Sequence, residues 1–152
     1  MLISDAETFN TRDKTMNLYI DCEWNDWGGE LISMALCSED NQEFYEVLEC
    51  KHPTKWVVDN VMPILDKDSV DKALFRQSLK MYLSKFKRIN IIADWPEDIA
   101  HFCYMLIEFP GWIIHTPPLT MEVIRIDAES NVPHNALEDA RALRLAIINS
   151  RG

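Results

Sequence analysis

Three strand-like segments joined by short turns occupy residues 17–50 and constrain the fold more than any other feature of the chain. Residues 17–24 alternate in polarity and are rich in strand-forming side chains, and residues 31–38 and 43–50 are two further segments of strand length. The turn sequences NDWGG and SEDNQ separate them, and Gly28 and Gly29 are free to adopt positive φ. Because strands joined by such short turns pair antiparallel, we expect an antiparallel meander here.

The rest of the chain changes to helical spacing interrupted by short apolar runs. Two helical stripes are expected over residues 56–64 and 74–86, and a third helix is expected to start at Pro96, where proline is well tolerated. The apolar run RINIIA at 88–93 predicts a buried strand, WII at 112–114 predicts another, and a last helix is expected over 135–149. A meander followed by alternating helices and strands predicts an α/β sandwich, with a mixed five-stranded sheet and helices on both faces.

Length and cysteine content limit the class of protein further. A chain of 152 residues is long enough for one domain, which we assign to residues 17–152, and the polar residues 1–16 are expected to form a flexible N-terminal arm. The cysteines (Cys22, Cys37, Cys50 and Cys103) show neither a CxxC pair nor metal-ligand spacing, which predicts reduced thiols in a cytoplasmic protein. No apolar run is long enough to span a membrane, so no membrane association is expected.

The charge balance narrows the nucleic-acid interpretations. A formal net charge of −10 argues against a protein that coats nucleic acid nonspecifically. It leaves open an enzyme that reaches nucleic acid through bound cations and a small basic patch. Six residues could supply that patch or simply form a solvated face: Lys80, Lys85, Lys87, Arg88, Arg141 and Arg144.

Two carboxylates follow the apolar start of the first strand. Asp21 and Glu23 are two residues apart, so in a strand they point to the same face. Two like charges close together are costly unless something neutralises them, and hard cations such as Mg²⁺ and Mn²⁺ prefer carboxylate oxygens. The alternative is a solvated strand end at which neither carboxylate binds anything.

Further acidic residues stand at the ends of later elements. Asp94 follows the strand at 88–93, and Asp98 falls in the first turn of the next helix. There its negative charge could equally interact with the positive end of the helix dipole. Asn135 has the N-x-x-E spacing of a capping box, so the last helix is expected to begin there. His134 then lies in the loop before that helix and is expected to fold over the site that Asp139 faces, unless both are ordinary surface residues.

The combination of D-x-E, a mid-chain aspartate and H-x₄-D resembles the DEDDh group of 3′–5′ exonucleases. Within that group the chain is similar to small bacterial and mycobacterial RNase T-like exoribonucleases, through GGELISMAL, KWVVDNVMPIL and the ending HNALEDAR. The resemblance covers residues 17–148 and implies an RNase H-like sandwich, with 17–152 as a single exonuclease domain. One departure concerns the middle motif, where Glu97 stands in place of the usual aromatic residue. Asp98 is assigned to that motif and Asp94 is its alternative.

The resemblance implies two-metal hydrolysis of phosphodiester bonds from a free 3′ end of single-stranded or overhanging RNA. Two divalent cations, Mg²⁺ with Mn²⁺ as a substitute, would be held by Asp21, Glu23, Asp98 and Asp139. His134 would be the general base, because histidine titrates near neutral pH and Mg²⁺ prefers oxygen. The resemblance also implies a homodimer.

The sequence says less about which residues contact the substrate and about whether RNA or DNA is cut. Trp24 and Asn25 follow the D-x-E motif and are assigned to substrate binding, although Trp24 could instead be a core residue. RNA is favoured over DNA as the substrate. The alternatives are a 3′–5′ exodeoxyribonuclease of the proofreading or repair type, a nuclease of the wider RNase H-like class that cuts internally, and a catalytically silent nucleic-acid-binding domain of the same fold.

Overall fold

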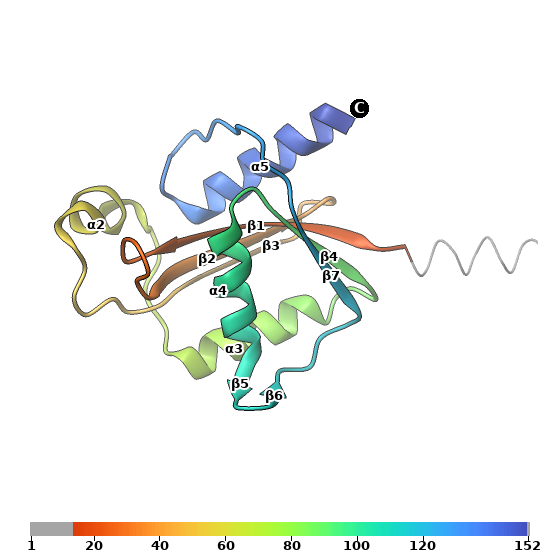
Figure 1. The fold of residues 1–152 in the computed structure, drawn as a ribbon, viewed down its shortest axis with the longest axis horizontal. Helices are drawn as coiled ribbons and strands as arrows, with labels where there is room; N and C mark the ends of the chain where they lie inside the picture. The colour runs from red at the N-terminus through yellow and green to blue at the C-terminus, as the bar shows by residue number, and fades with distance from the viewer. Residues whose placement is uncertain (1–13, 152) are drawn as a thin grey trace, which may run out of the picture.

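The computed structural model describes residues 14–151 and has a five-stranded mixed sheet at its centre (Figure 1). The strands are β1 (Met16–Trp24), β2 (Leu31–Ser38), β3 (Glu43–Val47), β4 (Ile89–Ala93) and β7 (Leu119–Val123), in the spatial order β3-β2-β1-β4-β7. β1, β2 and β3 pair antiparallel, whereas β4 pairs parallel with both β1 and β7. The predicted α/β architecture and its N-terminal meander are therefore confirmed.

Within residues 14–151, four helices pack around the sheet, and three of them begin at a side chain that caps a free backbone N–H. The helices are α2 (Lys55–Asn60), α3 (Lys72–Leu83), α4 (Pro96–Leu106) and α5 (Ala136–Arg151), with a short 3₁₀ turn, η1 (Met62–Ile64), after α2. Thr54 caps α2 and Asp71 caps α3. The Asn135 Oδ1 accepts a hydrogen bond from the Glu138 N–H at 3.1 Å, which is the helix start that the sequence predicts.

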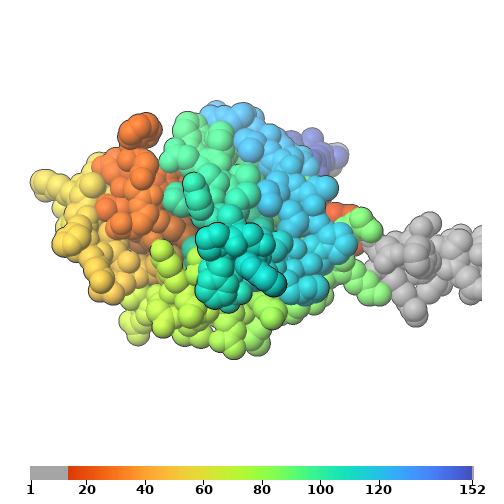
Figure 2. Space-filling view, turned by 60° about the horizontal axis from the view of Figure 1, so that its bottom comes forward, coloured from red at the N-terminus to blue at the C-terminus, as the bar shows by residue number. Residues whose placement is uncertain are grey.

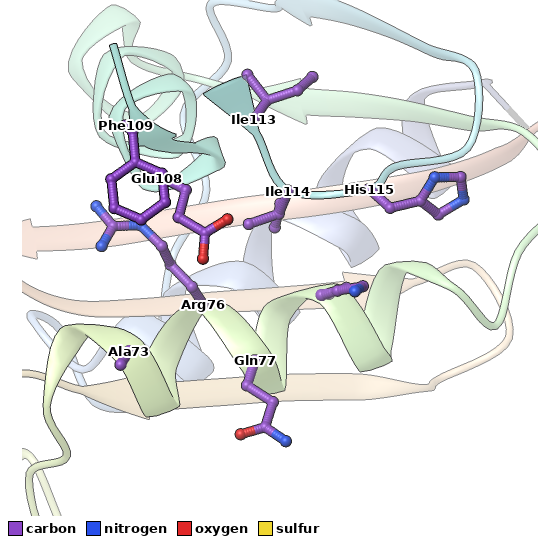
Figure 3. A pocket seen from close by; sticks show the side chains of 9 residues that line it. Ala73, Arg76, Gln77, Glu108, Phe109, Ile113, Ile114 and His115 are labelled. Carbon is purple, nitrogen blue, oxygen red and sulfur yellow. The ribbon is translucent and has the colours of Figure 1, made fainter. Parts of the chain in front are cut away.

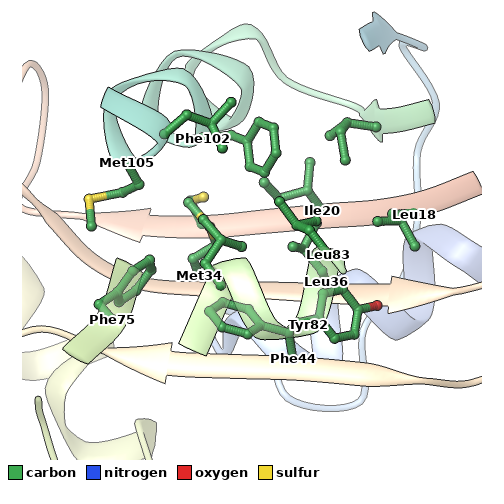
Figure 4. Close-up of a cluster of buried hydrophobic side chains, with 14 of the residues drawn as sticks. Leu18, Ile20, Met34, Leu36, Phe44, Phe75, Tyr82, Leu83, Phe102 and Met105 are labelled. Carbon is green, nitrogen blue, oxygen red and sulfur yellow. The ribbon is translucent and has the colours of Figure 1, made fainter. Parts of the chain in front are cut away.

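The sheet is covered on both faces, because alternate residues of each strand point to opposite sides. Leu18 and Ile20 of β1 pack with α3 and α4 in the largest hydrophobic cluster, around Phe75 and Phe102 (Figure 4). Tyr19 points the other way and packs with Leu143 and Ile147 of α5, so α3 and α5 lie on opposite sides of the sheet in Figure 1. Asp21 and Glu23 continue the Tyr19 side of β1, so their side chains lie on the α5 face.

The fifth strand of the sheet is not the one expected from the sequence. Residues 112–114 were predicted to supply it, but Trp112–Ile113 (β6) pairs antiparallel with Ile107–Phe109 (β5) in a separate two-stranded hairpin. The fifth strand of the main sheet is instead β7, which forms one of its edges beside β4 and follows Pro117 and Pro118. The third strand also ends at Val47, earlier than the predicted residue 50.

Two further expectations concern the N-terminus and membranes. Residues 1–13 of the expected flexible arm lie outside the described residues, and Met16, the last residue assigned to that arm, already belongs to β1. Among the residues that the structure describes, every helix is too short or too polar to span a bilayer.

Candidate metal centre

Five carboxylates from four separate segments meet at one end of the sheet. Oxygen atoms of Asp21, Asp94 and Asp98 all lie within 4.8 Å of one another, and the same holds for Asp21, Glu23 and Asp139. Asp21 therefore belongs to both groups of three, which we call the first triad (Asp21, Asp94, Asp98) and the second triad (Asp21, Glu23, Asp139). Asp94 and Asp98 are alternatives on the sequence alone, whereas the structure brings both to the cluster.

The fold explains why residues so far apart in the chain meet. β1 and β4 are parallel neighbours, so Asp21 near the end of β1 and Asp94 just after β4 lie at the same end of the sheet. α4 begins shortly after Asp94 and places Asp98 in its first turn, where Asp98 is only 1% exposed. The Asp98 Oδ1 accepts a hydrogen bond from the Cys22 N–H at 3.0 Å, which fixes the start of α4 to β1.

The second triad is completed by α5. Asp139 lies in the first turn of α5, on the face of the sheet to which Glu23 points. α5 approaches the sheet closely because the contact is made by small side chains: Ala136 and Ala140 of the helix pack against Ala35 and Cys37 of β2. Bulkier residues at these positions would hold Asp139 away from β1.

The cluster is electrostatically strained in the absence of cations. Burial, followed by the neighbouring carboxylates Asp98 and Glu23, raises the pKa of Asp21 well above its usual range. Burial also raises the pKa of Asp98 well above its usual range, against the opposing hydrogen bond from Cys22. Burial, together with the charge of Asp139, raises the pKa of Glu23 to about 9. Burial is likewise the main cause of the raised pKa values of Asp94 and Asp139.

His134 stands beside the second triad, in the loop before α5. Its backbone adopts φ +71°, and its N–H donates a hydrogen bond to the Asp139 Oδ2 at 3.1 Å. Its ring packs edge-on against Trp56 of α2, with centroids 5.0 Å apart. The Asn135 side chain ties the same loop to the Ile64 carbonyl at 2.7 Å. The loop is therefore held from two sides, by α5 and by the α2–η1 segment.

The two residues assigned to substrate binding are engaged within the protein. Trp24 is partly buried against the main core and its ring stacks on His101 of α4, with centroids 5.1 Å apart. The Asn25 side chain donates to the His52 carbonyl and accepts from the Thr54 N–H, each at 2.9 Å, so it joins the β1–β2 turn to the start of α2. Trp27, at the tip of that turn, is 91% exposed and was not singled out from the sequence.

The cluster has the chemistry of a site for hard cations. The Asp21 Oδ2 is buried and has no hydrogen-bond partner among the described residues, although it lies at the point that both triads share. A buried carboxylate oxygen without a donor is costly, and a cation is the partner that suits a cluster made only of carboxylates. The residues present therefore fit divalent cations.

No model of a known protein family matches this chain, and no curated protein matches it. The resemblance to DEDDh exonucleases therefore rests on the residues quoted above, and membership of that group stays a prediction.

One basic residue at the cluster was missed in the sequence. Arg125, which follows β7, donates a hydrogen bond to the Asp94 carbonyl, and its guanidinium lies over the Trp95 ring at 4.7 Å. Its charge opposes the rise in the pKa of Asp94. No motif marks it, because its position depends on β7, which the sequence did not reveal.

The predicted basic patch is not a single surface. Arg141 pairs with Glu43 and Glu138, and Arg144 donates to the carbonyls of Ser38 and Glu39. These two arginines fasten α5 to the meander. Of the six predicted residues, Lys80 lines the cavity between α3 and the β5–β6 hairpin.

Proposed function

We propose that this protein is a metal-dependent 3′–5′ exonuclease that hydrolyses phosphodiester bonds at the 3′ end of single-stranded or overhanging RNA. The observation that carries the proposal is that Asp21 is shared by two carboxylate triads. A shared central carboxylate flanked by two further pairs suits a site for two cations, and two-cation sites are common in enzymes that cleave phosphodiesters.

The residues that would hold the cations are those of the two triads. Asp21, Asp94 and Asp98 would hold one, and Asp21, Glu23 and Asp139 the other. When bound, such cations lower the pKa of an attacking water and stabilise the charge on the leaving oxygen. The chain itself supplies a rigid frame for these ligands, because the Asp98 carboxylate is fixed by the Cys22 N–H and the Asp139 carboxylate by the His134 N–H.

His134 is the proposed general base. It belongs to the loop that precedes Asp139, and an imidazole there can accept a proton from the attacking water. The edge-on contact with Trp56 restricts the orientation of the ring before the substrate arrives. Both features support the role that the H-x₄-D spacing suggests.

The finer fold assignment and the cellular setting belong to the same proposal. The mixed five-stranded sheet with helices on both faces is compatible with the RNase H-like sandwich that the resemblance implies. The four cysteines are free thiols, in keeping with a cytoplasmic protein. A homodimer is proposed from the resemblance alone.

The test is a cleavage assay on single-stranded RNA and single-stranded DNA, each labelled at the 5′ end. We expect a ladder that shortens from the 3′ end with Mg²⁺ or Mn²⁺ and no cleavage with EDTA, with RNA cut faster than DNA. Asp21→Asn should abolish cleavage, since it removes a ligand from both triads. Asp59→Asn, which changes an exposed aspartate paired only with Lys55, is the matched control and should cleave normally.

The alternatives give different products in the same assay. Faster cutting of DNA would favour the exodeoxyribonuclease, and internal cuts would favour an endonuclease of the wider class. A folded protein that cleaves neither polymer in either metal contradicts the proposal and favours a silent binding domain.

A further inference from the structure

Two adjoining cavities lie on the face of the molecule that carries α3 and the β5–β6 hairpin. The first, of about 1070 Å³, lies between the turn after β1, the start of α3 and the outer face of α4. The second, of about 560 Å³, lies between α3 and the hairpin (Figure 3). Arg76 lines both, so they form one continuous depression, which we call the α3 groove. Its walls lie side by side on the face shown in Figure 2.

The groove comes within one turn of α4 of the candidate metal centre. On α4, Asp98, His101 and Tyr104 are spaced by three residues and so lie along one side of the helix. Asp98 belongs to the first triad, His101 stacks on Trp24, and Tyr104 lines the groove with its side chain 71% exposed. His101 lines the groove one helical turn after Asp98, whereas none of the five carboxylates lines either cavity.

The groove also carries a regular row of positive charge. Lys72, Arg76 and Lys80 are spaced by four residues on α3, which places them on one side of that helix, and all three line the groove. Figure 3 shows Arg76 rising from α3 toward Phe109, whose ring is 62% exposed on the opposite wall.

Four acidic residues also line the groove (Glu30, Glu49, Asp71 and Glu108), of which Glu49 and Glu108 are exposed and the other two are occupied by the protein itself. Asp71 caps α3 through the Leu74 N–H, and Glu30 accepts a hydrogen bond from the Cys50 thiol. The lysines at 72 and 80 are exposed and face the groove from one wall. Lys51 also lines the groove, so four basic residues stand against the four acidic ones and the groove is close to neutral in a chain of net charge −10, with three of its cations on one side of α3.

We propose that the α3 groove binds the unpaired strand of a single-stranded nucleic acid, on the 5′ side of the bond held at the carboxylate cluster. Phosphates would contact Lys72, Arg76 and Lys80, and bases would stack on Tyr104 and Phe109. A basic row facing exposed aromatic rings is the combination that single-strand binding requires, because phosphates need positive charge and every base has a face that stacks. This inference rests on the proposed function, since the groove is read as the continuation of its site.

The first test measures binding without cleavage. A fluorescent single strand of about 12 nucleotides, as RNA and as DNA, is titrated with the full-length protein in EDTA and followed by anisotropy. We expect the double variant Lys72→Gln/Lys80→Gln to bind about tenfold more weakly, with a salt dependence shallower by about 0.7 for each phosphate that is no longer neutralised. Tyr104→Ser should also weaken binding about tenfold while leaving the salt dependence unchanged. Lys87→Gln, an exposed lysine outside the groove, is the matched control.

The second test separates the groove from the chemistry. With Mg²⁺, the same variants should slow cleavage of the longer strand more than cleavage of a dinucleotide, which is too short to span the groove. If the variants weaken binding as expected but nothing is cleaved, the groove stands and the exonuclease proposal fails. If cleavage occurs but the groove variants bind and cut the longer strand like the wild type, the groove proposal is overturned. Self-association that disappears in Tyr104→Ser, with strand binding intact, would also overturn it and assign this face to a second copy of the chain.

Discussion

Replacing Glu23 by glutamine is expected to stabilise the metal-free protein at neutral pH. Glu23 is partly buried beside Asp139, and its pKa rises to about 9 in the folded protein. In the unfolded chain the same group has a pKa near 4.5. Between these two pKa values, Glu23 therefore carries a proton in the folded protein and has lost it in the unfolded chain. By linkage, stability is greatest below about pH 4.5 and is lost as the pH rises toward about 9.

The size of the effect on the free energy of unfolding follows from the distance between these two pKa values. Between about pH 4.5 and about pH 7 the folded state keeps this proton, and the free energy of unfolding falls by about 1.4 kcal/mol for each pH unit. At neutral pH, Glu23 alone therefore lowers the free energy of unfolding by about 3 kcal/mol. The raised pKa values of Asp21, Asp98, Asp94 and Asp139 act in the same direction. Against a typical total stability of about 5–15 kcal/mol, the slope should be readily visible.

Urea unfolding in EDTA, followed by circular dichroism at several values between about pH 5 and about pH 8, measures this slope. Wild type should lose stability across the series, Glu23→Gln should lose less, and Glu49→Gln, at an exposed glutamate, should match wild type. Added Mn²⁺ should restore wild-type stability most at the higher pH, where binding displaces the fewest protons. Wild-type stability that stays flat or rises with pH in EDTA, or an unchanged slope in Glu23→Gln, would refute the account of the cluster.

Three other changes test separate parts of the site. In calorimetric titrations with Mn²⁺, Asp21→Asn should lose binding at both triads, whereas Asp94→Asn should keep the binding of the second triad; equal loss in the two variants would contradict the shared role of Asp21. Trp56→Ala should lower kcat about tenfold at unchanged KM and shift the pH profile of kcat, because the ring contact orients His134. Trp56→Phe should retain most activity. Because Trp56 is 48% exposed, the melting temperature of either variant should hardly change. Ala140→Leu should cost about 1–3 kcal/mol in urea unfolding and weaken Mn²⁺ binding, because a larger side chain forces α5 away from β2; unchanged metal affinity would show that the α5 contact does not position the site.

The parts of the site that the sequence predicted are those governed by local rules. Strand alternation places Asp21 and Glu23 on one face, and the capping geometry of Asn135 fixes where α5 begins. Those two rules also put His134 in the loop and Asp139 in the first turn of the helix. Each depends on neighbours within a few residues, so the chain alone contains the information.

The fifth strand was misassigned because the local signal was misleading. β7 is an edge strand whose residues are only partly buried, and it includes Thr120 and Glu122, so it lacks the apolar pattern of a central strand. Residues 112–113 are apolar, yet both side chains of β6 are exposed in a two-stranded hairpin. Arg125 was missed for the same reason, since only the placement of β7 brings it to Asp94.

The choice between Asp94 and Asp98 could not be made from the sequence because both positions meet the local requirements. Asp94 ends a strand whose parallel neighbour carries Asp21, and Asp98 opens the helix that follows. The hydrogen bond from the Cys22 N–H to the Asp98 Oδ1 joins the start of α4 to β1, and oxygen atoms of Asp94 and Asp98 both lie within 4.8 Å of Asp21. That bond joins residues 76 positions apart, and nothing near either residue signals it.

The second triad depends on an even longer-range match, between a strand and a helix about a hundred residues later in the chain. Ala35 and Cys37 are fully buried in β2, and Ala136 and Ala140 are fully buried against them in α5. Small residues in both elements let the helix axis approach the sheet, and the bonds from Arg144 to the carbonyls of Ser38 and Glu39 fix its position along β2. The carboxylate of Asp139 reaches Glu23 only because both conditions hold. The repulsion within the cluster is thus opposed by the packing of Ala136 and Ala140 and by the hydrogen bonds of Arg144, so the sheet–helix contact is as much a part of the site as the carboxylates it brings together.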